Sequence, residues 1–208
     1  MLYRVCRSLG LSVALLLVCL SAWAAEFSAD LMMTSGGKQS RGKVYLKGTR
    51  MRCELAHGDR RIVFLTQSGR SSVTIIIPEK RIYWAQPDPT AADIFDDKRI
   101  LKQATKNVVG QETIAGYKCR KAVYTYRDKT KGVVTRWVST RLKVPLKWEE
   151  TQGDARTVTE FRGILERKLQ DSMFSPPAGF KKLTEKQVQE MMKRGAEKAK
   201  AQKAPTKQ

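Results

Sequence analysis

The feature that most constrains this chain is a series of short runs in which apolar and polar residues alternate, each closed by turn-forming residues. In the first run Phe27, Leu31 and Met33 share one face, and a serine with two glycines at 35–37 ends it. A repeat of two residues is the side-chain period of a half-buried β-strand. Roughly ten such runs lie between residues 26 and 168, and helices do not alternate with them as a parallel sheet requires. They predict a mainly β fold, either one large curved antiparallel sheet or a barrel.

Two segments depart from this pattern. Residues 87–104 lose the period of two, and Thr90 is predicted to cap a short helix over the apolar residues at 91–95. Residues 174–180 contain two prolines between two phenylalanines, so they cannot be helical throughout. We expect the aromatic ends of this second segment to pack against the sheet.

The C-terminal residues 183–208 are predicted to form a basic helix that continues into a disordered tail at about Lys200. Thr184 and Gln187 have the spacing of a capping box, and Val188 and Met191 begin an apolar stripe with helical spacing. The stripe has to lie on the domain, on a membrane surface or on a partner. Residues 181–208 include nine basic and three acidic residues, so this end is a candidate for contact with an anionic membrane surface.

Residues 1–24 have the order of a cleaved signal peptide. Arg4 and Arg7 precede an apolar stretch from Leu9 to Leu20, and Ala22 and Ala24 provide small residues before the expected cleavage site. We therefore expect a secreted, periplasmic protein with a sheet domain at residues 25–182.

Two cysteines remain after the expected cleavage, Cys53 and Cys119, in a compartment that permits oxidation. The sequence allows two interpretations of these cysteines. The cysteines form an internal disulfide across the sheet, or they are two separate buried thiols.

The composition argues against an enzyme. The single histidine, His57, is predicted to lie in a turn, and the sequence has no Gly-rich phosphate loop and no Cys/His spacing typical of a metal site. The acidic pairs Glu149-Glu150 and Asp96-Asp97 are adjacent in sequence, so on a strand their side chains point to opposite faces. We expect no catalytic residues, no metal ligands and no cofactor. The net charge of +20 would suit nucleic acid, but no nucleic-acid-binding motif accompanies it, so we do not expect that partner.

Four motifs occur in order along the chain and carry a resemblance. They are Ile-Pro-Glu-Lys-Arg-Ile-Tyr at 77–83, Val-Gly-Gln-Glu-Thr-Ile-Ala-Gly-Tyr-Lys-Cys at 109–119, Trp-Val-Ser at 137–139 followed by Val-Pro-Leu-Lys at 144–147, and Phe-Ser-Pro-Pro-Ala-Gly-Phe at 174–180. Over residues 26–182 the chain resembles an uncharacterised family of bacterial periplasmic proteins related to the LolA/LolB superfamily, which sorts outer-membrane lipoproteins. The resemblance implies a strongly bent, antiparallel half-barrel with helices over its concave side. In the sorting proteins that concavity shelters acyl chains.

A bent, open sheet exposes an apolar concave face unless something fills it. We therefore predict a non-enzymatic carrier or binding protein for a hydrophobic ligand, such as a lipid or a lipoprotein acyl chain. The alternative is an envelope interaction protein whose basic surface contacts anionic lipid, lipopolysaccharide or a protein. The candidate lining residues, which could equally be core residues beneath the covering helix, are Phe27, Leu31, Tyr45, Met51, Phe64, Ile76, Tyr83, Trp137, Trp148 and Phe161.

Overall fold

A computed structural model describes residues 25–57, 60–91 and 93–203 of the 208-residue chain. The predicted signal peptide at 1–24 and the end of the predicted tail at 204–208 lie outside the described residues. The described chain contains twelve strands: β1 (Glu26–Ser35), β2 (Lys38–Lys47), β3 (Arg50–His57), β4 (Arg60–Gln67), β5 (Ser72–Ile77), β6 (Ile82–Pro87), β7 (Ala104–Ile114), β8 (Tyr117–Tyr126), β9 (Val133–Ser139), β10 (Pro145–Gln152), β11 (Ala155–Glu166) and β12 (Lys181–Lys182).

Helices are few among the described residues. The α-helices are α1 (Lys98–Leu101) and α2 (Glu185–Lys203). Short 3₁₀ turns occupy η1 (Pro78–Lys80), η2 (Lys129–Lys131) and η3 (Asp171–Phe174).

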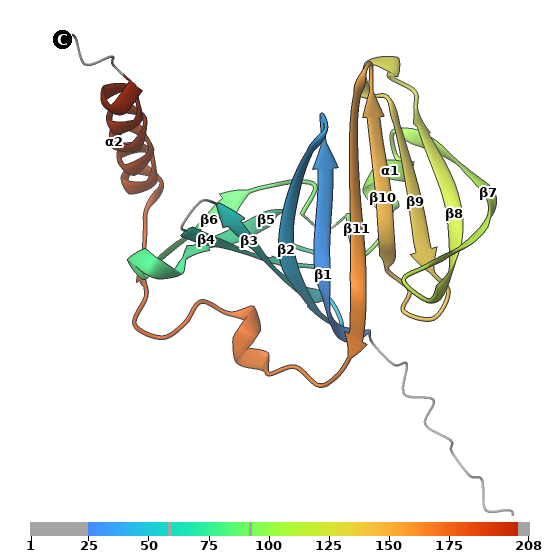
Figure 1. Ribbon diagram of the computed structural model, residues 1–208, viewed down its shortest axis with the longest axis horizontal. Coiled ribbons are helices and arrows are strands. Elements are labelled where there is room, and N and C mark those ends of the chain that lie inside the picture. The colour runs from blue at the N-terminus through green and yellow to red at the C-terminus, as the bar shows by residue number, and fades with distance from the viewer. Residues whose placement is uncertain (1–24, 58–59, 92, 204–208) are drawn as a thin grey trace, which may run out of the picture.

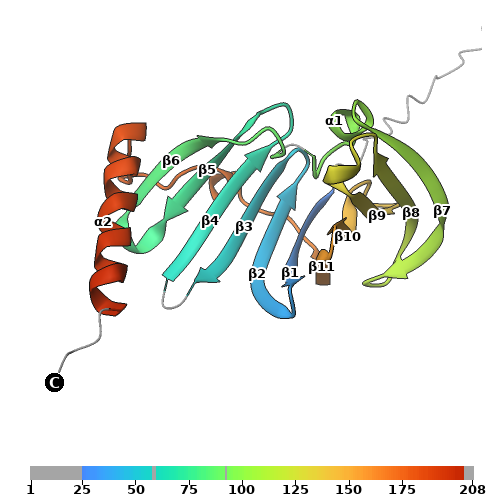
Figure 2. The same cartoon turned by 90° about the horizontal axis from the view of Figure 1, so that it is seen from above.

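All twelve strands form one sheet in the order β12-β6-β5-β4-β3-β2-β1-β11-β10-β9-β8-β7. Neighbours pair antiparallel except for β12, which adds two residues parallel to β6. The pairing of β1 with β11 joins the meander β1–β6 to the meander β7–β11, so the first strand lies in the middle of the sheet. Figures 1 and 2 show the sheet bending strongly along its length. The prediction of one strongly curved antiparallel sheet is confirmed.

One face of the sheet, called here the inner face, carries the largest core cluster. Phe27, Leu46 and Phe161 on this face are at most 1% exposed, and the rings of Phe161 and Trp148 meet edge to face at 5.6 Å. The segment that leads from β6 at one end of the sheet to β7 at the other passes over this face. Its residues Ile94 and Phe95 pack against the cluster.

At the β4–β6 end both faces of the sheet are covered. On the inner face, Val188 and Met191 of α2 pack with Val73, Ile75 and Trp84. The apolar stripe of the C-terminal helix therefore lies on the domain. The predicted capping box is present, because Gln187 N–H donates to Thr184 Oγ1 and Thr184 N–H donates to Gln187 Oε1.

The outer face of these strands and of β3 is covered by the segment that leads from β11 to β12. The guanidinium of Arg50 lies 5.2 Å from the ring of Phe174, and that of Arg81 lies 5.6 Å from the ring of Phe180. Phe180 also packs with Ile76 in an outer-face cluster. The predicted packing of both aromatic ends of residues 174–180 is confirmed.

Three local features differ from the prediction made from the sequence. The helix expected at Thr90 is a series of turns, because Thr90 donates its N–H and its hydroxyl to Asp88 Oδ1 instead of capping a helix, and the helical turn is α1, further along the chain. The run of Val44, Tyr45 and Leu46 predicts a strand from Lys43 to Lys47, but β2 already starts at Lys38. His57, expected in a turn, is the last residue of β3.

Candidate functional site

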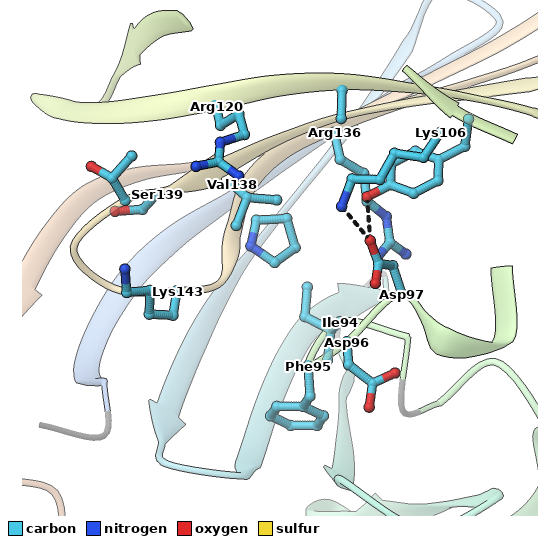
Figure 3. A pocket seen from close by; sticks show the side chains of 14 residues that line it. Ile94, Phe95, Asp96, Asp97, Lys106, Arg120, Arg136, Val138, Ser139 and Lys143 are labelled. Atoms are coloured by element: carbon cyan, nitrogen blue, oxygen red, sulfur yellow. Dashed lines mark hydrogen bonds and ion pairs between the residues drawn. The ribbon is translucent and has the colours of Figure 1, made fainter. Parts of the chain in front are cut away.

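A cavity of about 390 Å³ lies between the inner face of β7–β9 and the segment that crosses it (Figure 3). Ile94, Phe95, Asp96 and Asp97 of the crossing segment form one side. The sheet side and the adjoining β9–β10 loop contribute Lys106, Arg120, Ala122, Tyr124, Arg136, Val138, Ser139, Thr140, Lys143 and Pro145. The lining thus combines apolar side chains with four cationic groups and two carboxylates.

Asp97 accepts hydrogen bonds from two side chains at one end of the cavity. Its Oδ2 accepts hydrogen bonds from Lys106 Nζ at 2.6 Å and from the Tyr124 hydroxyl at 2.8 Å (dashed in Figure 3). Burial alone would raise the pKa of Asp97, but these two hydrogen bonds outweigh it and lower that pKa. Burial and the adjacent carboxylate both raise the pKa of Tyr124, so the phenol stays protonated at neutral pH. The carboxylate of Asp97 is thereby satisfied within the protein.

Arg136 is a buried cation with few partners. Its residue is 9% exposed, one Nη donates to the carbonyl oxygen of Asp93 at 2.7 Å, and its guanidinium carbon lies 5.8 Å from the ring centre of Tyr124. Its Nε–H has no hydrogen-bond partner among the described residues. The carboxylate of Asp93 does not form an ion pair with Arg136, because it is paired and hydrogen-bonded with Arg99.

Two further cations of the cavity, Arg120 and Lys143, form no ion pair with any described residue. Arg120 lies on β8 opposite Val138 of β9, so Arg136 is its diagonal neighbour across the two strands. Lys143 sits in the β9–β10 loop with φ of 60°, in the left-handed region that residues with a Cβ adopt at a cost. Its N–H donates to the Ser139 carbonyl, which fixes the loop at the cavity.

None of the ten predicted lining residues lines this cavity. Phe27, Leu31, Met51, Trp148 and Phe161 do lie together on the inner face, but within the packed core cluster, and Phe64 packs near α2.

The remaining four lie on the outer face. Tyr45 alternates with the inner-face residues Val44 and Leu46, and Ile76 and Tyr83 pack in the outer-face cluster. Trp137 follows Arg136 directly, so it leaves the sheet on the opposite side, but it is only 4% exposed and belongs to the same core cluster as Phe161. The ammonium groups of Lys121 and Lys147 lie 5.0 and 4.7 Å from its ring.

The two cysteines are free thiols in the structure. Cys53 lies on β3 and Cys119 on β8, and five strands separate β3 from β8 in the sheet. They are therefore not neighbours on adjacent strands. Both nevertheless contact the same core cluster, which corresponds to the alternative of two separate buried thiols.

The described ranges contain no group of three or more His, Cys, Asp or Glu side chains arranged to hold a metal ion. Among these residues, no helix has the length and apolar character that a membrane crossing needs.

Comparison with known proteins places the chain in a family. A family model described as a domain of unknown function, DUF4412, matches residues 28–144. The chain belongs to the DUF4412 family. The matched range runs from β1 through the β9–β10 loop, and every residue that lines the cavity except Pro145 falls within it. No curated protein matches the sequence.

Solved structures with a similar fold have low sequence identity to this DUF4412 member. An uncharacterized conserved protein from Thermus thermophilus is 10% identical at a TM-score of 0.54, over 77% of this chain and 91% of the other. MucB, solved in complex with MucA(peri), is 15% identical at a TM-score of 0.52 over 77% of this chain, which spans 57% of the MucB chain. A LolA superfamily protein from Nitrosomonas europaea is 13% identical at a TM-score of 0.37, over 73% and 90% of the two chains. At this level of identity the likeness to the Thermus thermophilus protein and to MucB is one of fold.

Proposed function

We propose that this protein is a non-enzymatic binding or carrier protein of the bacterial envelope, which holds the hydrophobic part of a small ligand on the inner face of its sheet. The observation that carries the proposal is the cavity beneath residues 94–97. Its volume of about 390 Å³ lies in the range typical of small-molecule sites. Ile94, Phe95 and Val138 supply apolar surface there, and burial of a ligand chain against them is favourable without any chemical step.

The proposed site differs from the one expected from sequence. The large aromatic residues of the inner face fill the space around Phe161 with their own side chains, so the space left for a ligand lies further along the sheet, at β7–β9. The crossing segment covers this space and is held to the sheet by the hydrogen bond from Arg136 to the Asp93 carbonyl. A ligand that enters would lie between the segment and the sheet.

Filling the cavity tests the proposal. We expect Val138→Trp to weaken binding of a fluorescent fatty acid at least about tenfold, because the indole would occupy the space of the ligand. Val109→Trp is the matched control, since Val109 is 50% exposed and lies outside the cavity. If Val138→Trp does not fold, Ala122→Leu tests the same space with a smaller change. Equal binding by the cavity variant and the control would contradict the proposal, as would purified protein that carries no lipid by native mass spectrometry and binds no fatty acid.

A second proposed function is contact with an anionic membrane surface through α2. The specific observation is that Val188 and Met191 turn inward onto the sheet, while Lys186, Lys193 and Arg194 are exposed. Each basic residue near an anionic surface contributes about 1 kcal/mol. We expect replacement of these three residues by glutamine to reduce adsorption to anionic vesicles at low salt, with no effect on neutral vesicles. Unchanged adsorption would mean that the charge of α2 has no part in membrane contact.

A further inference from the structure

We infer that the cavity binds an amphiphile with a single anionic headgroup, a carboxylate or a phosphate, and that Arg136 with Arg120 and Lys143 holds that headgroup. The inference rests on the proposed function and adds the chemical class of the ligand and the residues that select it.

Arg136 is a buried cation with an unsatisfied N–H donor. A guanidinium offers five N–H donors, and burial of a charge is costly unless the charge is paired and hydrogen-bonded. At 9% exposure, Arg136 uses one Nη for a backbone carbonyl and rests on the ring of Tyr124, while its Nε–H is buried without a partner. No carboxylate among the described residues forms an ion pair with it. An anion beside Arg136 would supply the missing acceptor.

The cavity carries more positive than negative charge. Its two carboxylates are already satisfied, because Asp97 accepts from Lys106 and Tyr124, and Asp96 accepts from the backbone N–H of Lys98 at 3.1 Å. Arg120, Arg136 and Lys143 therefore remain as cations without a carboxylate partner in a space that also lacks a free carboxylate. The cavity is left with an excess of positive charge that a ligand anion would neutralise.

Arg120 and Arg136 lie on neighbouring strands and line the same cavity. Diagonal neighbours on antiparallel strands lie about 7–8 Å apart, which is within the reach of two arginine side chains that converge on one group. Arg120 and Arg136 have this relation on β8 and β9, and both line the cavity. Figure 3 shows Arg120 and Arg136 on the strands and Lys143 on the β9–β10 loop, at the opposite side of the cavity from Asp97. Guanidinium groups match the planar oxygens of carboxylate and phosphate with paired hydrogen bonds.

A neighbouring hollow is less suited to an anion. A second hollow of about 460 Å³ also touches Arg136, but it is lined by Glu150, whose carboxylate has no cationic partner among the described residues. That hollow also contains Lys131 and the Arg99–Asp93 ion pair, so its excess of positive charge is smaller than that of the cavity in Figure 3. The cavity of Figure 3 also carries Ile94, Phe95 and Val138, and at about 390 Å³ it is larger than a small anion needs. Both features favour an amphiphile over a free anion.

The experiment compares probes that differ only at the head. Dodecanoate, dodecyl phosphate, dodecanol and inorganic phosphate are titrated into the purified protein by calorimetry. We expect the two anionic amphiphiles to bind about 10- to 100-fold more tightly than dodecanol, because hydrogen bonds between charged groups are lost with the alcohol. We expect inorganic phosphate alone to bind much more weakly than dodecyl phosphate.

Variants then assign the preference to residues. Arg136→Gln and, separately, Arg120→Gln should lower the preference for dodecanoate over dodecanol, and Arg136→Lys should retain part of that preference. Arg70→Gln removes the same charge from the exposed β4–β5 turn and should change nothing. Because Arg120 is exposed, its variant tests the inference even if Arg136→Gln does not fold.

The outcomes are distinguishable. Equal affinity of the unchanged protein for dodecanoate and dodecanol would overturn the inference and leave the proposed hydrophobic site standing. Binding of neither would overturn both. Phosphate alone binding as tightly as dodecyl phosphate would make this a site for a free anion and overturn the assignment to an amphiphile, as would an unaltered headgroup preference in both arginine variants.

Discussion

Asp97 links the stability of the cavity wall to pH. Its pKa is lowered from the ordinary value of 3.8, with burial opposing the shift and the hydrogen bonds from Lys106 and Tyr124 causing it. A group whose pKa falls on folding contributes stability that is present above its unfolded pKa and is lost as the pH falls through the folded value.

We therefore predict that Asp97→Asn lowers the free energy of unfolding at pH 7, and that the difference from the unchanged protein shrinks as the pH falls below about 3.8. Urea denaturation at a series of pH values measures this. A destabilisation that stays constant down to pH 2 would show that Asp97 acts by packing and not by charge.

The cysteines yield a second prediction. Burial raises the pKa of Cys53 to about 12, and burial also raises the pKa of Cys119, so neither thiolate is populated at pH 8. We expect iodoacetamide to leave both residues unmodified in the folded protein and to modify both after unfolding without reductant. Unfolded, unreduced protein with no modified cysteine would instead establish the disulfide.

Glycine matters most at position 132, where η2 leads into β9. Gly132 has φ of 72°, and a Cβ there would lie 1.9 Å from the carbonyl oxygen of Thr151 on β10. Gly153 also has a positive φ, of 55°, but a Cβ there meets nothing within 4 Å.

We predict that Gly153→Ala costs about 1 kcal/mol of stability from the backbone conformation alone, and that Gly132→Ala costs at least twice as much because the β9–β10 pair has to shift. Thermal unfolding of both variants compares them. Similar losses would mean that the strand pair moves aside freely.

At the scale of elements, α2 packs on the sheet through only one of its sides. Val188 is 8% exposed against Trp84, whereas Met192, four residues further on, is 55% exposed. We predict that Val188→Ala costs about 1–2 kcal/mol and shifts Trp84 fluorescence to longer wavelength. Met192→Ala should stay within about 0.5 kcal/mol of the unchanged protein. Equal losses of stability in the two variants would show that α2 does not pack on the sheet through Val188.

The strands β4–β6 show what the sequence can and cannot predict about faces. The strands themselves follow from the pattern, but both of their faces are buried, one by α2 and the other by the segment that contains Phe180. In the run Ile75-Ile76-Ile77 every position is apolar, so the period of two cannot tell which residue points inward. This is why Ile76 and Tyr83 were expected on the concave side and lie on the outer one.

The cavity could not be predicted from the sequence for a different reason. Its walls come from residues 94–97 and from strands β7–β9, and only the crossing of the sheet by the first segment brings them together. Arg120 and Arg136 look like ordinary polar residues of alternating strands. The informative signal is that Arg136 is buried without a carboxylate, which depends on Asp93 being engaged by Arg99. Only the three-dimensional arrangement of the side chains contains that information.

At the scale of the whole molecule, the pairing of β1 with β11 makes the two meanders one unit. The largest core cluster includes Phe27 and Leu46 from the first meander and Leu146 and Phe161 from the second, so neither keeps its core if the other unfolds.

We therefore predict a single cooperative unfolding transition. Trp137 lies on β9 and Trp148 on β10. In a Trp84→Phe variant these two tryptophans remain in the described part of the chain, so their fluorescence measures unfolding of the second meander. Far-UV circular dichroism measures unfolding of the whole sheet. The two urea transitions should coincide, as two-state unfolding requires. The same pairing joins residues such as Phe27 and Glu166 from opposite ends of the domain, so refolding should be slow, in milliseconds to seconds. An earlier circular dichroism transition with unchanged tryptophan fluorescence would show that β2–β6 unfold alone, and that the β1–β11 ladder does not couple the meanders.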